Sequence, residues 1–196
     1  MKKILIIIIT SFLVLALLNG CNVNRISDKG IIEVETKDIA LEVNINKLLE
    51  YKESYVGDNS AVGGIIDNLP GMSTKGFALG TDSPPYSIEV DYGLRESSSI
   101  SIEEFDRYWN DGNTKKIFLN NATVFFILVK NADKVQFNVY ASNKYSFKVS
   151  REELEKFWGK DLRVYADNKE LWETEILKPI FNSDETVEDF FNSNNE

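Results

Sequence analysis

Alternating apolar and polar side chains over residues 86–94 constrain the fold of this chain more than any other feature of its sequence. The alternating positions are Tyr86, Ile88, Val90, Tyr92 and Leu94 against Ser87, Glu89, Asp91 and Gly93. A period of two predicts a strand with one buried and one wet face, as antiparallel sheets have. Phe77 and Leu79 alternate with small residues before a turn over residues 82–85, so we expect a hairpin here.

A second hairpin is predicted further along the chain. Its strands are marked by Val135, Phe137 and Val139 and then, after a turn over residues 142–144, by Tyr145, Phe147 and Val149. Between the hairpins lies the apolar run 122–129, which periodicity alone leaves open between helix and strand. Its length and the helical spacing of Phe118, Ala122, Phe125 and Val129 favour a buried helix.

Capping boxes predict two short helices, one between the hairpins and one after them. In the first box Ser101 precedes Glu104 by three residues, and in the second Ser150 precedes Glu153 in the same way. We expect Gly159 to end the second of these helices.

Helical spacing also appears before the first hairpin. Ile45, Leu48, Leu49, Tyr55 and Val56 predict one apolar stripe, and Gly57 suits a left-handed helix end. A second helix is indicated by Val62, Ile65, Ile66 and Leu69, and Pro70 stops it. Gly63 and Gly64 within it suggest that another backbone packs close by.

Together these elements predict an α+β fold. We expect a two-layer domain over residues 43–180, with an antiparallel sheet from two hairpins and helices packed on one face. Residues 181–196 form an acidic, Asn-rich C-terminal tail, in which Phe190 and Phe191 are the candidates for docking onto the domain.

The N-terminus is typical of an exported protein. Residues 1–20 combine Lys2, Lys3 and an apolar run over residues 4–18 that is short for a membrane-spanning helix, which predicts a signal peptide. Leu18-Asn19-Gly20-Cys21 resembles the bacterial lipobox, and this resemblance implies cleavage before Cys21 and lipidation of Cys21. We expect residues 21–42 to be a tether, with a short strand over residues 31–36 as the alternative.

One stretch of the chain resembles a known family. The residues that carry the resemblance run from Leu48-Leu49-Glu50-Tyr51-Lys52 through Tyr55-Val56-Gly57-Asp58-Asn59-Ser60 to Leu69-Pro70, with Pro85-Tyr86 and Leu128-Val129-Lys130-Asn131-Ala132-Asp133 later on. Over roughly residues 48–158 the chain is similar to the domain of unknown function 4825 (DUF4825) family. The resemblance implies an extracytoplasmic bacterial domain, found in lipoproteins or attached to sensory or peptidase-type membrane proteins, and implies no chemistry.

The amino-acid composition excludes most kinds of catalytic and metal-binding site. The 196 residues include no histidine and one cysteine, so imidazole bases, disulfides within the chain and thiolate metal clusters are excluded. A net charge of −9 argues against nucleic acid as a partner. We therefore expect no catalytic residues, no cofactor and no metal site.

The motif Tyr55, Gly57, Asp58, Asn59 and Ser60 is the candidate binding site. A polar cluster at a helix N-terminus can bind an anion, but the simpler interpretation is that one of its side chains caps the helix. An exposed aromatic patch of Tyr51, Tyr140 and Tyr165 is a second candidate.

The expected function is that of a membrane-anchored, extracytoplasmic lipoprotein with a non-catalytic binding or sensory domain. Its partners would be the membrane, through lipid on Cys21, and an envelope or sensor protein. The alternative is a small cell-wall or glycan hydrolase that uses carboxylates alone, for which the acidic clusters are Glu103, Glu104 and Asp106, and Glu152, Glu153 and Glu155.

Overall fold

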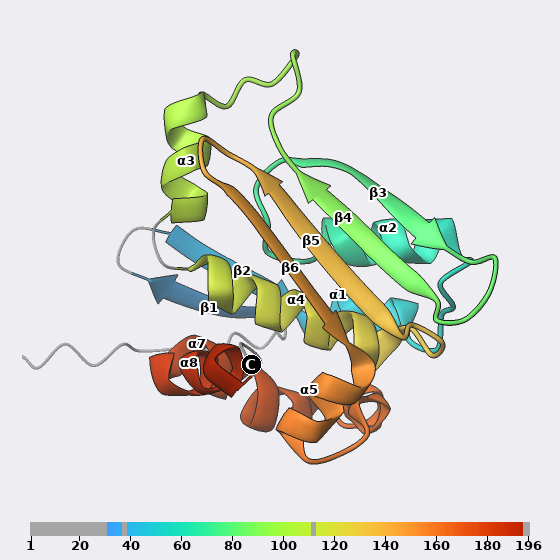
Figure 1. Ribbon diagram of the computed structural model, residues 1–196. Helices are drawn as coiled ribbons and strands as arrows, with labels where there is room; N and C mark the ends of the chain where they lie inside the picture. The colour runs from blue at the N-terminus through green and yellow to red at the C-terminus, as the bar shows by residue number, and fades with distance from the viewer. Residues whose placement is uncertain (1–30, 37–38, 111–112, 194–196) are drawn as a thin grey trace, which may run out of the picture.

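A four-stranded sheet with helices along one face forms the centre of the fold (Figure 1). The computed structural model describes residues 31–36, 39–110 and 113–193. The strands are β1 (Ile31–Thr36), β2 (Ile39–Asn44), β3 (Thr74–Gly80), β4 (Ser87–Tyr92), β5 (Lys134–Tyr140) and β6 (Lys144–Ser150). The helices are α1 (Ile45–Leu48), η1 (Leu49–Tyr51), α2 (Asn59–Asp67), α3 (Ile102–Asn110), α4 (Thr114–Leu128), α5 (Arg151–Trp158), η2 (Leu162–Asp167), α6 (Lys169–Trp172), η3 (Glu173–Leu177), α7 (Lys178–Asn182) and α8 (Asp184–Ser193).

Both predicted hairpins are confirmed, and so is the α+β class. The sheet has the order β3-β4-β5-β6, in which β3 pairs antiparallel with β4 and β5 pairs antiparallel with β6. The prediction of a purely antiparallel sheet is wrong, because β4 and β5 run parallel. Between the hairpins the chain passes through α3 and α4 and returns to the end of the sheet where β4 starts, so β5 takes the direction of β4.

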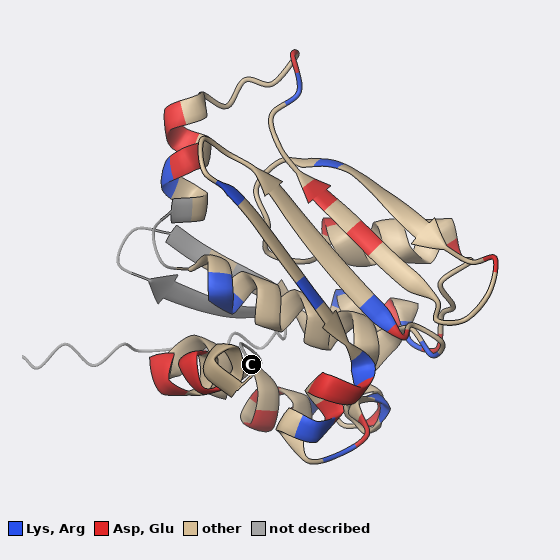
Figure 2. Ribbon diagram, viewed as in Figure 1, with Lys and Arg blue, Asp and Glu red and all other residues tan. Residues whose placement is uncertain are grey.

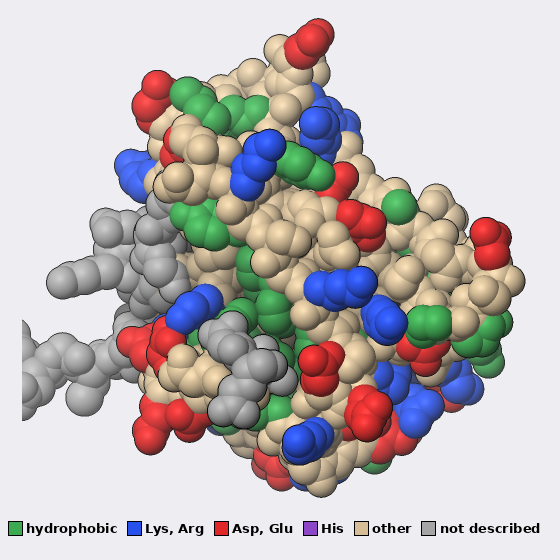
Figure 3. Space-filling view, viewed as in Figure 1, with side chains coloured by type: hydrophobic (Ala, Val, Ile, Leu, Met, Phe, Trp, Pro, Cys, Tyr) green, Lys and Arg blue, Asp and Glu red, His purple; other side chains and the backbone are tan. Residues whose placement is uncertain are grey.

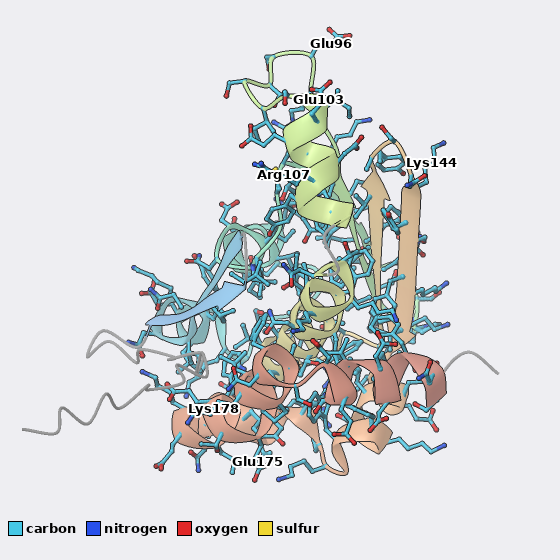
Figure 4. The ribbon with its side chains drawn as sticks, turned by 90° about the vertical axis from the view of Figure 1, so that its left-hand side faces the viewer. Glu96, Glu103, Arg107, Lys144, Glu175 and Lys178 are labelled. Carbon is cyan, nitrogen blue, oxygen red and sulfur yellow. The ribbon has the colours of Figure 1, made fainter. Side chains whose placement is uncertain are left out.

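Helix α4 resolves the ambiguity of the apolar run 122–129 in favour of a helix. It spans 15 residues, of which all but Lys115 and Lys116 are buried. A helix enclosed on nearly every side has no polar face, and its sequence therefore shows weak periodicity. The sheet covers one side of α4, and Figure 4 shows the β1–β2 hairpin on the side away from β5 and β6.

The two faces of the sheet differ as the alternation predicts. Ile88 and Val90 of β4 and Val135 and Phe137 of β5 are completely buried against the helices. Phe137 stacks on Phe118 of α4 with ring centroids 5.6 Å apart. The opposite face carries the polar side chains of the strands.

Local capping signals are confirmed at both ends of α5. The hydroxyl of Ser150 accepts the backbone N–H of Glu153, and the Glu153 carboxylate accepts the backbone N–H of Ser150. Gly159 ends the helix with a φ of 73°. Ser101 likewise accepts the backbone N–H of Glu104 at the start of α3.

The first predicted helix is shorter than its apolar spacing indicates. Helical structure ends at Tyr51, and Gly57 has no positive φ, so the predicted left-handed helix end is wrong. Ser54 instead forms a parallel bridge with Val129 at the end of α4. This long-range pairing prevails over the local helical pattern.

The segments outside the predicted domain limits contain regular structure. Over residues 31–36 the strand alternative is correct, since β1 pairs antiparallel with β2 within the segment expected as a tether. Residues 1–30, which hold the predicted signal peptide and Cys21, lie outside the described residues. At the C-terminal end α8 occupies much of the expected tail, and Phe190 is completely buried.

Candidate functional site

The predicted motif at residues 55–60 is arranged to start helix α2. Asp58 is the N-cap, and its Oδ1 accepts the backbone N–H of Ala61 at 2.9 Å. Tyr55 is 54% exposed, and Asn59 and Ser60 form the first turn of the helix. The interpretation that one side chain of the motif caps the helix is confirmed, with Asp58 as the cap, while a binding role for the motif stays a prediction.

The segments that carry the family resemblance meet at the junction of α4 and β5. The backbone N–H of Lys130 donates to the carbonyl oxygen of Ser54 at 2.8 Å. Asn131 accepts the backbone N–H of Val56 through its Oδ1 at the same distance. Asp133 accepts the backbone N–H of Tyr86 at 2.7 Å. These residues therefore hold three distant segments together.

Arg151 is a further part of this junction. Its guanidinium donates to the carbonyl oxygens of Phe126, Val129 and Ala132 at 2.7 to 2.9 Å. Burial lowers the pKa of Arg151, and the nearby Glu155 carboxylate opposes that shift. Because the last carbonyl groups of a helix lack partners within it, Arg151 acts as a side-chain cap for α4.

Three of the six carboxylates in the acidic clusters proposed for hydrolysis make structural bonds, namely Asp106, Glu153 and Glu155. Asp106 accepts both the backbone N–H and the hydroxyl of Ser142, which lowers the pKa of Asp106. Glu153 belongs to the capping box, and Glu155 lies 3.4 Å from Arg151. The pKa of Glu175 is also lowered, by hydrogen bonds from Lys160 and Tyr165. A general acid needs a raised pKa, which is the opposite direction.

A polar network lies on the open face of the sheet, and the sequence did not predict it. The Nδ2 of Asn138 donates to Glu89 at 2.6 Å and to Asp91 at 2.9 Å, so the amide bridges two carboxylates of β4. Gln136 donates to Glu89 and to the Asn138 carbonyl oxygen, and Ser146 donates to that same oxygen. Only the parallel register of β4 and β5, which places Asp91 opposite Asn138, brings these side chains together.

Buried amides of α4 form a second unexpected group. Asn121 donates to the carbonyl oxygen of Pro70 at 2.7 Å and to the Tyr92 hydroxyl at 3.3 Å. Burial raises the pKa of Tyr92 well above its ordinary value. Asn120 donates to Asn121, while its own Oδ1 has no partner among the described residues. The group fixes α4 against the loop after α2.

A cavity of about 670 Å³ opens beside β6, and we call it the aromatic cavity. In the space-filling view, hydrophobic side chains gather in the hollow near the middle of the molecule (Figure 3). The residues that line the cavity come from α3, α4, β6 and α8: Trp109, Thr114, Lys115, Phe118, Lys144, Tyr145, Ser146, Phe147, Glu188 and Phe191. The sequence predicted several of these rings on the buried side of their elements, but it did not predict that four separate elements would line one cavity.

Trp109, one of the residues that line the aromatic cavity, has an unused donor. Its side chain is 1% exposed, and its indole N–H has no hydrogen-bond partner in the described part of the chain. Lys115 at the rim is paired with Glu188 at 2.7 Å. With its aromatic lining, the cavity can accept an apolar group.

A second cavity, of about 760 Å³, lies at the end of the sheet next to α5. Asp133, Glu152 and Glu155 contribute carboxylates to its wall, along with Lys134 and Lys156. Asp133 and Glu155 already hold Tyr86 and Arg151, so two of the three acids of this cavity serve the junction described above.

The predicted aromatic patch does not form. Tyr140 is 44% exposed on the open face of the sheet, whereas Tyr165 is completely buried. Asp91 and Glu89 raise the pKa of Tyr140 by disfavouring its anion. Tyr51 is half-buried and lies against Gly64, so a ring, and not another backbone, fills the space that the glycine leaves.

Neither metal ligation nor a membrane span is seen in the residues described. Within residues 31–36, 39–110 and 113–193, no three acidic or thiol side chains are grouped so that they could hold a metal ion. In the same ranges, every helix is too short or too polar to cross a bilayer.

Comparison with known proteins gives one match. A family model described as a domain of unknown function, DUF4825, matches residues 48–150. The matched range contains both hairpins of the sheet and α4, and it ends at the last residue of β6. No curated protein and no solved structure matches the chain.

Proposed function

The chain belongs to the DUF4825 family of domains of unknown function, and because that family assigns no chemistry, we propose a function from the site itself. The protein is a lipid-anchored extracytoplasmic protein whose folded domain binds an envelope protein without catalysing a reaction. The aromatic cavity is the observation that carries this proposal.

The anchoring part of the proposal is supported by sequence. The apolar run before Leu18-Asn19-Gly20-Cys21 fits a lipoprotein signal, and two acyl chains are sufficient for stable attachment. Cleavage before Cys21 removes Lys2 and Lys3, so 20 basic residues remain against 31 acidic ones and the charge becomes −11. Such a domain gains nothing from anionic headgroups, and lipid is its means of attachment.

The position of the first strand sets how far the domain can lie from the membrane. Ile31, the first described residue, is ten positions after Cys21. A chain of ten residues reaches at most about 35 Å. The proposed partner must therefore have a part that is accessible close to the membrane surface.

The binding part of the proposal is supported by the nature of the aromatic cavity. Its volume of about 670 Å³ lies within the usual range for ligand sites. Tryptophan and tyrosine are enriched at binding hot spots between proteins, and Trp109 and Tyr145 both line this cavity. The Lys115–Glu188 pair at the rim adds polar groups beside the apolar lining.

The hydrolase alternative has weaker support. The carboxylates beside the second cavity favour it, but Asp133 and Glu155 already bond to the scaffold. Replacement of the remaining acid, Glu152→Gln, tests it directly. Release of soluble fragments from cell-wall glycan by the natural protein, and none by this variant, would establish the hydrolase.

Lipidation is tested by mass spectrometry of the protein extracted from membranes. We expect a mature N-terminus at Cys21 with a diacylglyceryl group, and retention of the uncleaved precursor in Cys21→Ser. An unmodified N-terminus at another residue contradicts the anchoring proposal.

Binding is tested by photo-crosslinking in intact cells. A photoreactive amino acid at Tyr145, in the cavity wall, is compared with the same amino acid at exposed Val164. We expect one discrete envelope-protein adduct from position 145 only, and its loss when Phe191→Asp places a charge in the cavity. No adduct from position 145, or the same adducts from both positions, contradicts the proposal.

A further inference from the structure

Strand β6 is an edge of the four-stranded sheet. Among the described strands, β5 is the one with which it pairs. Tyr145 and Phe147 lie on its helix-facing side, and Lys144, Ser146 and Lys148 are exposed on the other side. An edge strand presents backbone groups with which a further strand can pair.

The aromatic cavity lies along this edge. The consecutive residues Lys144, Tyr145, Ser146 and Phe147 of β6 form one of its walls, and α8 contributes Phe191, whose ring packs on that of Phe147 with centroids 5.2 Å apart. A strand added beside β6 would continue the alternation of the sheet. Its helix-facing side chains would then point into the aromatic cavity, beside the contact of Phe147 with Phe191.

Charge favours an acidic occupant. β6 carries Lys144 and Lys148 and no acidic residue, although the whole chain has a charge of −9. Figure 2 shows the basic positions of β6, and Figure 4 shows Lys144 extending outward beside the β5–β6 turn. Neither lysine has an ion-pair partner in the described part of the chain.

The same lysines disfavour a second copy of β6 as the occupant. In an antiparallel pair centred on Phe147, each Lys148 has the partner's Lys144 and Lys148 as diagonal neighbours. Like charges at such positions repel. Acidic side chains in the added strand would instead meet both lysines with opposite charge.

We propose that the partner adds an extended acidic segment to the edge of β6 and inserts an apolar side chain into the aromatic cavity. The inference rests on the proposed binding function and names the chemistry of the partner. Backbone pairing with β6 supplies affinity, the two lysines select acidic residues, and the aromatic lining of the cavity receives the inserted apolar side chain.

The test uses the purified protein and two synthetic ten-residue peptides. The first alternates Glu with Val and Phe, and the second has Lys in place of every Glu. We expect the acidic peptide to bind, to shift the amide resonances of β6 and to slow hydrogen exchange there. The Lys144→Glu/Lys148→Glu variant should weaken this binding about tenfold.

Lys134→Glu is the matched control, because Lys134 lies on the same face of the sheet but on the inner strand β5. We expect it to change affinity by less than about twofold. Equal binding of both peptides, unchanged β6 amides, or equal effects of the two charge reversals overturns the proposal. A dimer in light scattering, with β6 amides protected before peptide is added, overturns it in favour of a second copy.

Failure of strand addition can be distinguished from failure of the proposed binding function. An envelope adduct from position 145, with no response of the β6 amides to the acidic peptide, leaves the function standing and overturns strand addition. Absence of the adduct in cells overturns both.

Discussion

The guanidinium Nη2 of Arg151 lies 2.8 Å from the carbonyl oxygen of Val129, the residue at which helix α4 ends. The two residues are 22 positions apart and are joined through the second hairpin. One side chain thus connects the start of α5 with the end of the central helix.

Replacement of Arg151 by Met should destabilise the fold by about 3 kcal/mol, because three partly buried carbonyl groups lose a charged donor. Arg151→Lys should destabilise the fold less than Arg151→Met, since the ammonium keeps a charged donor, although it reaches fewer of these oxygens than the guanidinium does. Urea unfolding measures both values. Exposed Arg163→Met is the control, expected to cost less than about 1 kcal/mol, and equal losses at the two positions would contradict the capping role.

The N-cap of α2 separates a structural from a binding role for the predicted motif. Asp58→Ala should lower the free energy of unfolding by about 1 kcal/mol, whereas Asp58→Ser should retain most of it, because serine also accepts the Ala61 N–H. Ser60→Ala should have little effect on stability. Thermal unfolding checks the three variants, and a loss for Ser60→Ala as large as for Asp58→Ala would refute the assignment of the cap.

Two neighbouring glycines in α2 should respond in opposite directions to alanine. A Cβ at Gly63 would meet Phe77 at 3.7 Å, an ordinary contact, so Gly63→Ala should stabilise the helix by about 0.5–1 kcal/mol. A Cβ at Gly64 would come within 2.3 Å of the Tyr51 ring, so Gly64→Ala should destabilise it. Adding Tyr51→Ala should remove the steric part of that loss in a double-mutant cycle of unfolding free energies. Equal effects of the two single substitutions would contradict the contact with Tyr51.

Asp161 should give a small pH-dependent contribution to stability. Hydrogen bonds from Arg163 hold the pKa of Asp161 at about 2. Because this pKa is below that of the unfolded chain, the contribution is present above about pH 4 and is lost as the pH falls toward 2. Asp161→Asn should therefore cost less than about 1 kcal/mol at pH 7 and less still at pH 2.5, as measured by urea unfolding. A difference that grows on acidification would show that the sign is wrong.

Local signals in the sequence predicted most of the elements. Alternation identified β4, β5 and β6, and the Ser150–Glu153 box with Gly159 identified both ends of α5, because these patterns depend on residues that are neighbours in the chain. The parallel register of β4 and β5 depends on a connection of more than forty residues, and no local pattern encodes it.

Candidate sites were harder to predict than elements. The cap of α2 was predicted among Asp58, Asn59 and Ser60 because an N-cap acts within three residues, and the structure assigns it to Asp58. The aromatic cavity joins Trp109 and Phe191, which are far apart in sequence, and the network around Asn138 requires the register of two hairpins. Both arise from tertiary packing alone.

The parallel pair β4–β5 divides assembly of the sheet into fast and slow steps. In the first hairpin the closest paired residues, Gly80 and Ser87, are seven positions apart in sequence. In the second hairpin Tyr140 and Lys144 are four positions apart. Across the parallel pair, Ser87 and Lys134 are 47 positions apart. Since closing a longer loop costs more entropy and non-local contacts form slowly, each hairpin can reach its register before the centre of the sheet closes. The sheet is therefore joined last along its middle, when docking of α4 brings the two finished hairpins together.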